Sequence, residues 1–241
     1  MADALLEVRG LSKTFGGFAA LTGIDLDVIA GERLGLIGPN GSGKTTLINC
    51  ISGLLRADTG TIAFDGRNIT KAPAYRRAQA GISRSFQIPK PFASMTVLDN
   101  LCIPLKYAAH GTGGVAALED EAREILVMIG MGGKERAAPA ELTQIEMRKL
   151  ELARALAGRP KLLILDEVMA GLSNVEVDEI LAILQQLNER GITIIMIEHI
   201  LRAVMSFSGR LVVLDAGMKI AEGVPAEIIN DKEVEKAYLG Q

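Results

Sequence analysis

A glycine-rich stretch between two apolar segments carries the clearest chemistry in the sequence. Residues 38–46 fit the spacing G-x-x-x-x-G-K-[S/T] of a phosphate-binding loop, and they read Gly38-Pro39-Asn40-Gly41-Ser42-Gly43-Lys44-Thr45-Thr46. The apolar run 33–37 predicts a buried strand before the loop, and apolar spacing over 45–51 predicts a helix after it. This pattern requires a strand, a glycine loop and a helix in that order, so we predict that a nucleotide phosphate binds here.

The residue types in this loop suit a phosphate. Glycines let successive backbone N–H groups curl around phosphate oxygens, with the positive end of the helix dipole behind them. We expect Lys44 to reach the outer phosphates and Thr45 to place its hydroxyl on Mg²⁺. The alternative is a glycine-rich turn with a chance lysine, and the flanking strand and helix argue against it.

Two acids end a second apolar run, at residues 162–165. A carboxylate at the end of a buried strand is costly unless it meets a cation. Beside a phosphate loop that cation is Mg²⁺, which Asp166 would hold, usually through water. Glu167 would then orient and polarise the water that attacks the γ-phosphate. A strand that runs into an acidic turn is the alternative.

Gln87 and His199 are candidates with weaker support. Gln87 lies where the prolines of residues 88–91 break regular structure. A neutral amide there can coordinate Mg²⁺ or position water, although a solvated loop glutamine is the simpler interpretation. His199 follows the apolar run 192–197. On the sheet edge that carries Asp166 it could touch the γ-phosphate, whereas a lone histidine is usually a polar filler.

The first thirty residues predict an antiparallel hairpin. Strands are expected at 5–9 and 24–28, with a turn at 11–17 between them that carries Phe15. This aromatic could be the face on which adenine stacks, or it could be a core residue at the end of a strand. One aromatic near two glycines favours neither interpretation.

The remaining segments predict an alternation of strands and helices. Further strands are expected at 61–64, 82–87, 161–165, 192–197, 211–214 and 218–221, the last two as a hairpin. Further helices are expected at 95–109, 118–129, 145–156, 175–190, 225–229 and 233–239. We therefore predict one α/β domain, with a nucleotide-binding core over 1–90 and 157–241 and a helical subdomain over 91–156.

Composition excludes several classes of protein. The chain has 241 residues, is 49% hydrophobic and carries a net charge of −3, which gives no electrostatic footprint for nucleic acid. Apolar runs stay well short of the roughly 20 residues that a membrane helix needs. The N-terminal residues lack a basic region followed by a hydrophobic block, so we expect a cytosolic protein without a disulfide between Cys50 and Cys102.

Taken together, these motifs resemble the ATP-binding subunits of ABC transporters over essentially the whole chain. Their resemblance to the family's motifs is residue by residue: Walker A at 38–46, Walker B at 162–166, the catalytic glutamate at Glu167, the Q-loop at Gln87 and the switch histidine at His199. The resemblance implies a P-loop NTPase (RecA-like) core with an antiparallel β subdomain and an inserted helical subdomain. It also implies Mg²⁺-dependent ATP hydrolysis in a dimer sandwich that drives membrane-spanning permease subunits, on the cytoplasmic face of the inner membrane.

Shorter matches resemble the branched-chain amino acid importer branch of this family. They lie at residues 15–18, 50–53, 84–87, 95–100 and 237–240. The resemblance also implies that Phe15 is the family's adenine-stacking aromatic, and that a solute-binding protein acts indirectly with this chain. Substrate identity belongs to the other subunits, so urea, amides or another small polar solute remain open.

The chain departs from the family's signature motif, L-S-G-G-Q at the start of a helix. The matching residues are Thr143, Gln144, Ile145 and Glu146 after Leu142. In the family, the signature of one subunit closes over the ATP of its partner, and glycine allows close backbone approach. Ile145 would block that approach, and Glu146 would add negative charge near the phosphates. We expect a different ATP-binding subunit with an intact signature as the partner.

A second departure is Val168, which stands where the family usually has proline after the glutamate. We expect only a local change there. Two other functions stay open at this point: a weakly hydrolysing regulatory subunit of a heteromeric transporter, and a soluble ABC-type ATPase outside transport. The odd signature favours the first, whereas Glu167 and His199 argue against it. The second usually carries two ATPase halves, long insertions or basic surfaces.

Overall fold

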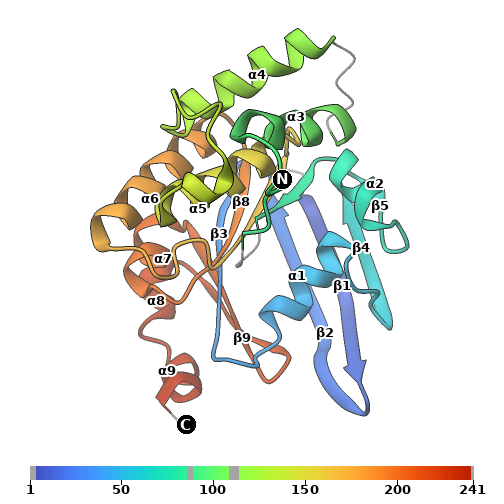
Figure 1. Cartoon of the computed structure of the whole chain (residues 1–241). Helices are drawn as coiled ribbons and strands as arrows, with labels where there is room; N and C mark the ends of the chain where they lie inside the picture. Colours follow the sequence, from blue (N-terminus) through green and yellow to red (C-terminus); the bar gives the residue numbers. More distant parts are fainter. Residues whose placement is uncertain (1–3, 86–88, 109–113, 240–241) are drawn as a thin grey trace.

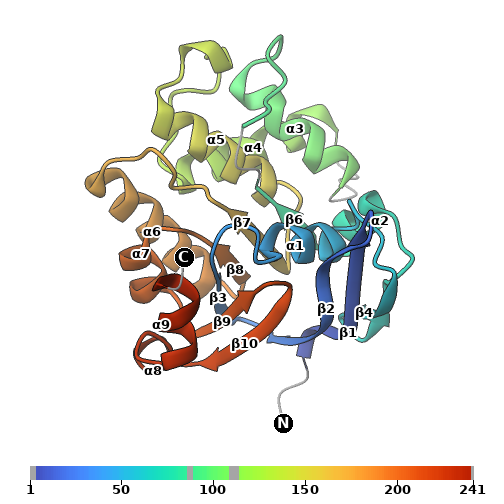
Figure 2. The same cartoon turned by 90° about the horizontal axis from the view of Figure 1, so that it is seen from below.

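The computed structural model describes residues 4–85, 89–108 and 114–239, which form two sheets and the helices that pack against them (Figures 1 and 2). The central sheet has the strand order β10-β9-β3-β8-β7-β6. Its strands are β3 (Arg33–Ile37), β6 (Ile82–Arg84), β7 (Leu162–Asp166), β8 (Thr193–Ile197), β9 (Arg210–Asp215) and β10 (Met218–Gly223). Neighbouring strands run parallel except β9 and β10, which form the hairpin predicted from the sequence.

A second, antiparallel sheet has the strand order β2-β1-β4-β5. Its strands are β1 (Ala4–Phe15), β2 (Phe18–Ile29), β4 (Thr59–Phe64) and β5 (Arg67–Asn68). The predicted hairpin at the start of the chain is present, but the turn predicted at 11–17 is wrong because β1 continues to Phe15. Leu11 is fully buried, and Ser12 pairs with β4 through the backbone of Thr59, which keeps the chain extended.

Helices pack on both faces of the central sheet and on one face of the antiparallel sheet. They are α1 (Lys44–Ser52), α2 (Ala74–Gln79), α3 (Val97–Tyr107), α4 (Val115–Met128), the 3₁₀ turn η1 (Pro139–Glu141), α5 (Gln144–Leu156), α6 (Asn174–Glu189), α7 (Leu201–Phe207), α8 (Pro225–Ile228) and α9 (Lys232–Leu239). The sequence predicted all of these except α2, η1 and α7. Helix α2 buries one residue, Arg77, and α7 is only two turns long, so neither shows a sustained apolar period.

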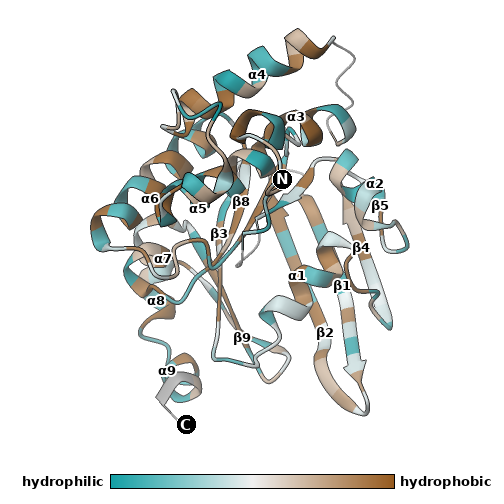
Figure 3. Ribbon diagram, in the orientation of Figure 1, coloured by the Kyte–Doolittle hydropathy of each residue, from teal (hydrophilic) through white to brown (hydrophobic). Residues whose placement is uncertain are grey.

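The parallel strands are apolar along their whole length because both faces of the central sheet are buried. In β7, Leu163 and Leu165 pack in a cluster with α3 to α7, whereas Leu162 and Ile164 pack with α1 and the antiparallel sheet. Figure 3 shows these strands mainly in white to brown, while the covering helices carry both teal and brown residues. The two clusters fix the register of β7, since a shift of one residue would exchange its faces.

Helices α3, α4 and α5 follow one another between β6 and β7 and lie together at one end of the molecule (Figure 1). They share a hydrophobic cluster with α6 and one face of the central sheet. Because that cluster is continuous, the predicted boundaries of a helical subdomain at 91 and 156 stay predictions. Among the described residues, no helix is long and apolar enough to cross a membrane.

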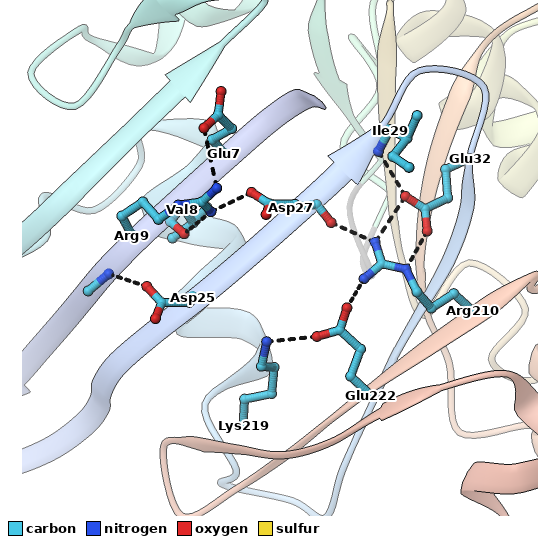
Figure 4. A network of polar contacts seen from close by, with 11 residues as sticks. Glu7, Val8, Arg9, Asp25, Asp27, Ile29, Glu32, Arg210, Lys219 and Glu222 are labelled. Carbon is cyan, nitrogen blue, oxygen red and sulfur yellow. Dashed lines mark hydrogen bonds and ion pairs between the residues drawn. The ribbon is translucent and has the colours of Figure 1, made fainter. Parts of the chain in front are cut away.

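Arg210 joins the two sheets (Figure 4). Its guanidinium donates to Glu32 Oε1 at 2.5 Å, to Glu32 Oε2 at 3.0 Å and to the carbonyl oxygen of Asp27 at 2.6 Å. It also pairs with Glu222 on β10, which in turn accepts from Lys219 at 2.7 Å. One β9 residue therefore holds β2, the turn before β3, and β10, and so fixes the strand that leads into the glycine loop.

Candidate active site

The carboxyl ends of three adjacent strands meet at one edge of the central sheet. Strand β8 lies between β3 and β7, and all three run parallel. The glycine loop follows β3, Asp166 and Glu167 end β7, and His199 follows β8. In parallel α/β sheets, ligands bind outside the carboxyl ends of the strands, so this edge is the expected place for a site.

Two glycines shape the loop that follows β3. Gly38 has φ of 149°, and a Cβ there would lie 2.1 Å from the carbonyl oxygen of Leu214 on β9. Gly43 has φ of 104°, and a Cβ there would lie 2.7 Å from the carbonyl oxygen of Ala20 on β2. Any side chain at either position would push the loop away from the strands that support it.

Lys44 begins α1 and folds back over the loop. Its ammonium donates to the carbonyl oxygens of Gly38 at 2.7 Å and Pro39 at 2.9 Å. Burial lowers the pKa of Lys44, while the nearby charges of Glu167 and Asp166 act in the opposite direction. A phosphate would give this buried cation the counter-charge that carbonyl oxygens only partly supply.

The N-terminus of α1 is open toward the loop. Gly43 is its N-cap, and in the described part of the chain no side chain caps the helix and no acid lies in its first turn. The first N–H groups of the helix and its positive dipole end are thus available to an anion. This is the arrangement that binds phosphate at helix N-termini.

A cavity of about 320 Å³ opens beside the loop. Its lining includes the predicted site residues Phe15, Asn40, Gly41, Ser42, Gly43, Lys44, Thr45, Thr46, Glu167 and His199, together with Phe18 and Ala20. The lining does not include Gly38, Pro39 or Asp166. Gln87 lies outside the described residues.

Glu167 and His199 both line the cavity and contact each other. His199 Nε2 lies 2.9 Å from Glu167 Oε1. Glu167 has φ of 51°, an unusual backbone conformation for a residue with a side chain, and its N–H donates to the carbonyl oxygen of Ile197 at 2.9 Å. The strained turn directs a carboxylate and an imidazole to the same place, a pairing suited to hold water or move a proton.

Asp166 is buried at the end of β7 and is bound by Arg84, for which the sequence predicted no role. Its Oδ2 lies 2.5 Å from Nη2 of Arg84 on β6, and both side chains are 8% exposed. The sequence did not predict this contact, because β6 is only three residues long and shows no pattern that would place Arg84 beside Asp166. Within the described residues, no group of three or more histidines, cysteines and acids could form a metal site by itself.

Phe15 stands at the tip of the β1–β2 hairpin, 46% exposed and opposite Phe18 in register. Lys13 Nζ lies 5.5 Å from the centre of the Phe15 ring and pairs with Asp58 at 2.8 Å. Asp58 also accepts from the backbone N–H of Thr14 at 2.7 Å, and these hydrogen bonds lower its pKa to about 2. Lys13 therefore contacts the ring of Phe15, which lines the cavity. An exposed ring at the cavity fits stacking on adenine better than a role in the core.

Glu198 is a further residue that the sequence analysis left without a role. It is buried, and its Oε1 accepts the backbone N–H of Met169 at 2.9 Å. Burial raises the pKa of Glu198 to about 7, and the charge of Glu167 acts in the same direction. Arg148 of α5 donates to the carbonyl oxygen of Ala170 at 3.2 Å, so the segment after Glu167 is held from two sides.

The predicted signature residues form the start of α5. Thr143 is the N-cap, and its side chain and that of Glu146 cap each other's backbone N–H groups at 3.4 and 2.9 Å. Glu146 also pairs with Lys134 at 2.9 Å, so its charge has a partner within the chain. Gln144 is exposed, whereas Ile145 is half-buried against the helical cluster. Val168 is buried in that cluster as well.

A model of the ABC transporter family matches residues 21–170. The chain belongs to the ABC transporter family. Its last residues, 218–241, match a second model, described as branched-chain amino acid ATP-binding cassette transporter. The predicted fold class, an α/β P-loop NTPase, is confirmed by solved ABC cassettes of the same architecture.

Relatives of this ABC subunit match over nearly full length. The high-affinity branched-chain amino acid transport ATP-binding protein BraF of Pseudomonas aeruginosa is 35% identical and covers 100% of both chains. A probable branched-chain amino acid transport ATP-binding protein LivG of Archaeoglobus fulgidus is 37% identical, covering 98% of this chain and 95% of the relative. A solved ABC cassette in an ADP conformation has a TM-score of 0.90 at 33% identity, covering 99% and 100%.

Family membership establishes the activity. The chain is an ATP-binding subunit and an ATPase, as the sequence predicted. Membership also implies membrane-spanning permease partners and a pair of cassettes. The roles of individual residues in the cavity stay predictions.

Proposed function

We propose that this ABC ATPase powers an importer of branched-chain or similar amino acids. The observation that carries the catalytic part is the convergence of the glycine loop, Glu167 and His199 on one cavity. The names of the relatives and the matched C-terminal model support the substrate class. In this proposal the chain lies at the cytoplasmic face of the inner membrane and acts with a solute-binding protein only indirectly.

In the proposed reaction, ATP lies with its adenine on Phe15 and its phosphates in the loop of residues 38–46. Lys44 leaves the loop carbonyls for the outer phosphates. Glu167 holds the attacking water and takes its proton, while His199, at hydrogen-bond distance from Glu167, contacts the γ-phosphate. Gln87 is the remaining catalytic candidate, placed by the sequence pattern alone.

Mg²⁺ is the proposed metal, with Thr45, Asp166 and Gln87 as its residues. The donors fit, because hydroxyl and carboxylate oxygens are ligands that Mg²⁺ prefers. Thr45 lines the cavity, whereas Asp166 is buried and is not part of the lining, so Asp166 would act through water. When bound, the metal neutralises charge on the outer phosphates.

The second ATP-binding subunit is proposed to be a different chain. Thr143 and Glu146 satisfy each other's N–H groups, and Ile145 fills the position where the family has glycine. The start of α5 is therefore a poor phosphate site because of these capped N–H groups and Ile145, and the charge of Glu146 adds little to this because it is paired with Lys134. A partner with an intact signature would complete the ATP site of this chain. A weakly hydrolysing, regulatory role is the second candidate that the same observation favours.

A groove of about 580 Å³ is the proposed docking place for a permease subunit. It lies between α2, β6, α3 and α5 and is lined by the aromatics Phe92 and Tyr107. Arg154 lies 5.0 Å from the ring of Phe92 and pairs with Glu151 at 2.5 Å. Aromatic side chains beside a paired charge are typical of a surface that receives a protein segment.

Uptake by whole cells tests this function. Cells that lack the gene for this chain are given the wild type or Glu167→Gln, and uptake of labelled leucine, urea and an amide is measured. We expect the wild type alone to restore leucine uptake. Tyr107→Asp should reduce uptake while leaving the ATPase activity of the isolated chain unchanged. Restored uptake of urea or an amide but not of leucine would overturn the substrate class.

A further inference from the structure

Arg84 is a buried arginine that the proposed reaction does not use. Its Nη2 lies 2.5 Å from Asp166 Oδ2, and its Nη1 donates to Asn49 Oδ1 at 2.5 Å. Both members of the ion pair are 8% exposed. One guanidinium thus connects β6 with the end of β7 and with α1.

The burial of this pair decides what it can do. A buried carboxylate needs a cation, and a charge left unpaired in the interior is strongly destabilising. In the proposed reaction Mg²⁺ is the cation near Asp166, and here Arg84 already fills that role. A guanidinium at hydrogen-bond distance also reduces the net negative charge that a divalent cation would feel.

We propose that Arg84 is the resident counter-ion of Asp166, which stabilises the subunit without metal and competes with Mg²⁺ for that carboxylate. This inference rests on the proposed role of Asp166 at the metal site. Arg84 is a positioning residue here, because it acts on the metal through Asp166. If the two cations compete, removal of Arg84 lowers the stability of the metal-free protein and lowers the Mg²⁺ concentration at which the metal stabilises it.

Arg77 provides a matched control. It is 2% exposed, and its guanidinium donates to the carbonyl oxygens of Cys50 at 2.6 Å and Ile51 at 2.8 Å, at the end of α1. The side chains of both arginines are largely buried, and both contact α1. Only Arg84 contacts Asp166 among the contacts described. Replacement of either arginine by methionine removes the same guanidinium and its positive charge and leaves an unbranched apolar side chain.

The test is thermal unfolding of the full chain with ADP, in EDTA and over a series of Mg²⁺ concentrations. We expect Arg84→Met to lower Tm in EDTA and to reach half of its Mg²⁺-dependent shift at about tenfold lower Mg²⁺ than the wild type, the size of one charge-assisted hydrogen bond. Arg77→Met should lower Tm but keep the wild-type Mg²⁺ response.

Equal Mg²⁺ responses in Arg84→Met and the wild type would overturn the competition. So would a weaker response in the variant, since that would mean that Arg84 is needed to place the carboxylate. If Arg84→Met does not fold, Arg84→Lys replaces the guanidinium by a single ammonium group and keeps the charge. Arg84→Lys should also reach half of its Mg²⁺-dependent Tm shift at a lower Mg²⁺ concentration than the wild type. No Mg²⁺ response in the wild type would instead overturn the metal site itself.

Discussion

His199 Nε2 lies 2.9 Å from Glu167 Oε1, and the two residues come from the ends of adjacent parallel strands. Neither side chain is buried, and both line the cavity beside the glycine loop. A carboxylate and an imidazole in contact at a phosphate-binding loop can share the handling of one water and its proton. The parallel sheet thus brings together the two side chains that we propose act on the attacking water and the γ-phosphate.

Replacement of His199 by alanine should reduce ATPase activity by roughly ten- to a hundredfold, the size of one hydrogen bond to a charged group. ATP binding, measured by equilibrium dialysis, should change little because the glycine loop is intact. Arg202→Ala is the control, since Arg202 lies three residues further along the chain and pairs with Asp178 at an exposed place. Full activity in His199→Ala would contradict the role of this histidine.

Phe15→Ala should raise KM for ATP by about five- to a hundredfold with little change in kcat, because base stacking on an aromatic contributes roughly 1–3 kcal/mol. Phe15→Tyr should preserve KM. Asp58→Asn weakens the anchor of Lys13 behind the ring, so we expect a smaller rise in KM. An unchanged KM in Phe15→Ala would show that adenine lies elsewhere.

Glu198 predicts a pH dependence of stability. Its pKa is raised from an ordinary 4.5 to about 7 in the folded protein, so the folded state holds a proton that the unfolded state releases. Its contribution to the free energy of unfolding is therefore greatest below pH 4.5 and is lost as the pH rises to about 7. The loss corresponds to about 3 kcal/mol.

Glu198→Gln keeps an acceptor for the N–H of Met169 and removes the titration. Urea unfolding of wild type and variant at pH 5.0, 6.0 and 7.5 measures the difference. We expect the wild type to lose more stability than the variant across this range. Parallel curves for the two proteins would contradict a raised pKa at Glu198.

Ile145→Gly should change stability and activity in opposite directions. It removes side-chain packing against the helical cluster and adds glycine to a helix, so the free energy of unfolding should fall by roughly 1–3 kcal/mol. The same change opens the start of α5 to a partner's phosphate, so ATPase activity of the chain alone should rise.

Met147→Gly is the matched control for this test. Met147 is half-buried in the same helix and packs against the same cluster. It should lose stability without a gain in activity. If Ile145→Gly also gains no activity, the signature does not limit this subunit, and a different second cassette is no longer required by the sequence.

The sequence predicted the parts of this site that local patterns encode. Residues 33–37 are a strand with those bounds because an apolar run meets an obligatory glycine loop. The edge shared by Asp166 and His199 followed from the rule that parallel strands end together. Phe15 could be placed only by the structure, because whether it faces a cavity depends on how a hairpin packs against the glycine loop.

Other features needed contacts between distant segments. Arg84 and Asp166 are 82 positions apart, and nothing in the short strand β6 indicates an ion pair. The partner of Glu146, Lys134, lies in a loop whose path no periodicity describes. The turn predicted at 11–17 was wrong because pairing with β2 keeps Lys13 and Thr14 extended despite their polarity. Long-range packing decides each of these cases.

Steady-state ATPase activity of the purified chain, compared with Glu167→Gln, tests the central claim most directly. Glutamine keeps the shape of Glu167 but cannot take a proton, so we expect turnover to be lost while ATP stays bound through Lys44. Turnover that is low in the wild type alone and rises on addition of a second cassette with an intact signature would fit the account. Undiminished turnover in Glu167→Gln would contradict it, because the proton from the attacking water would then go elsewhere.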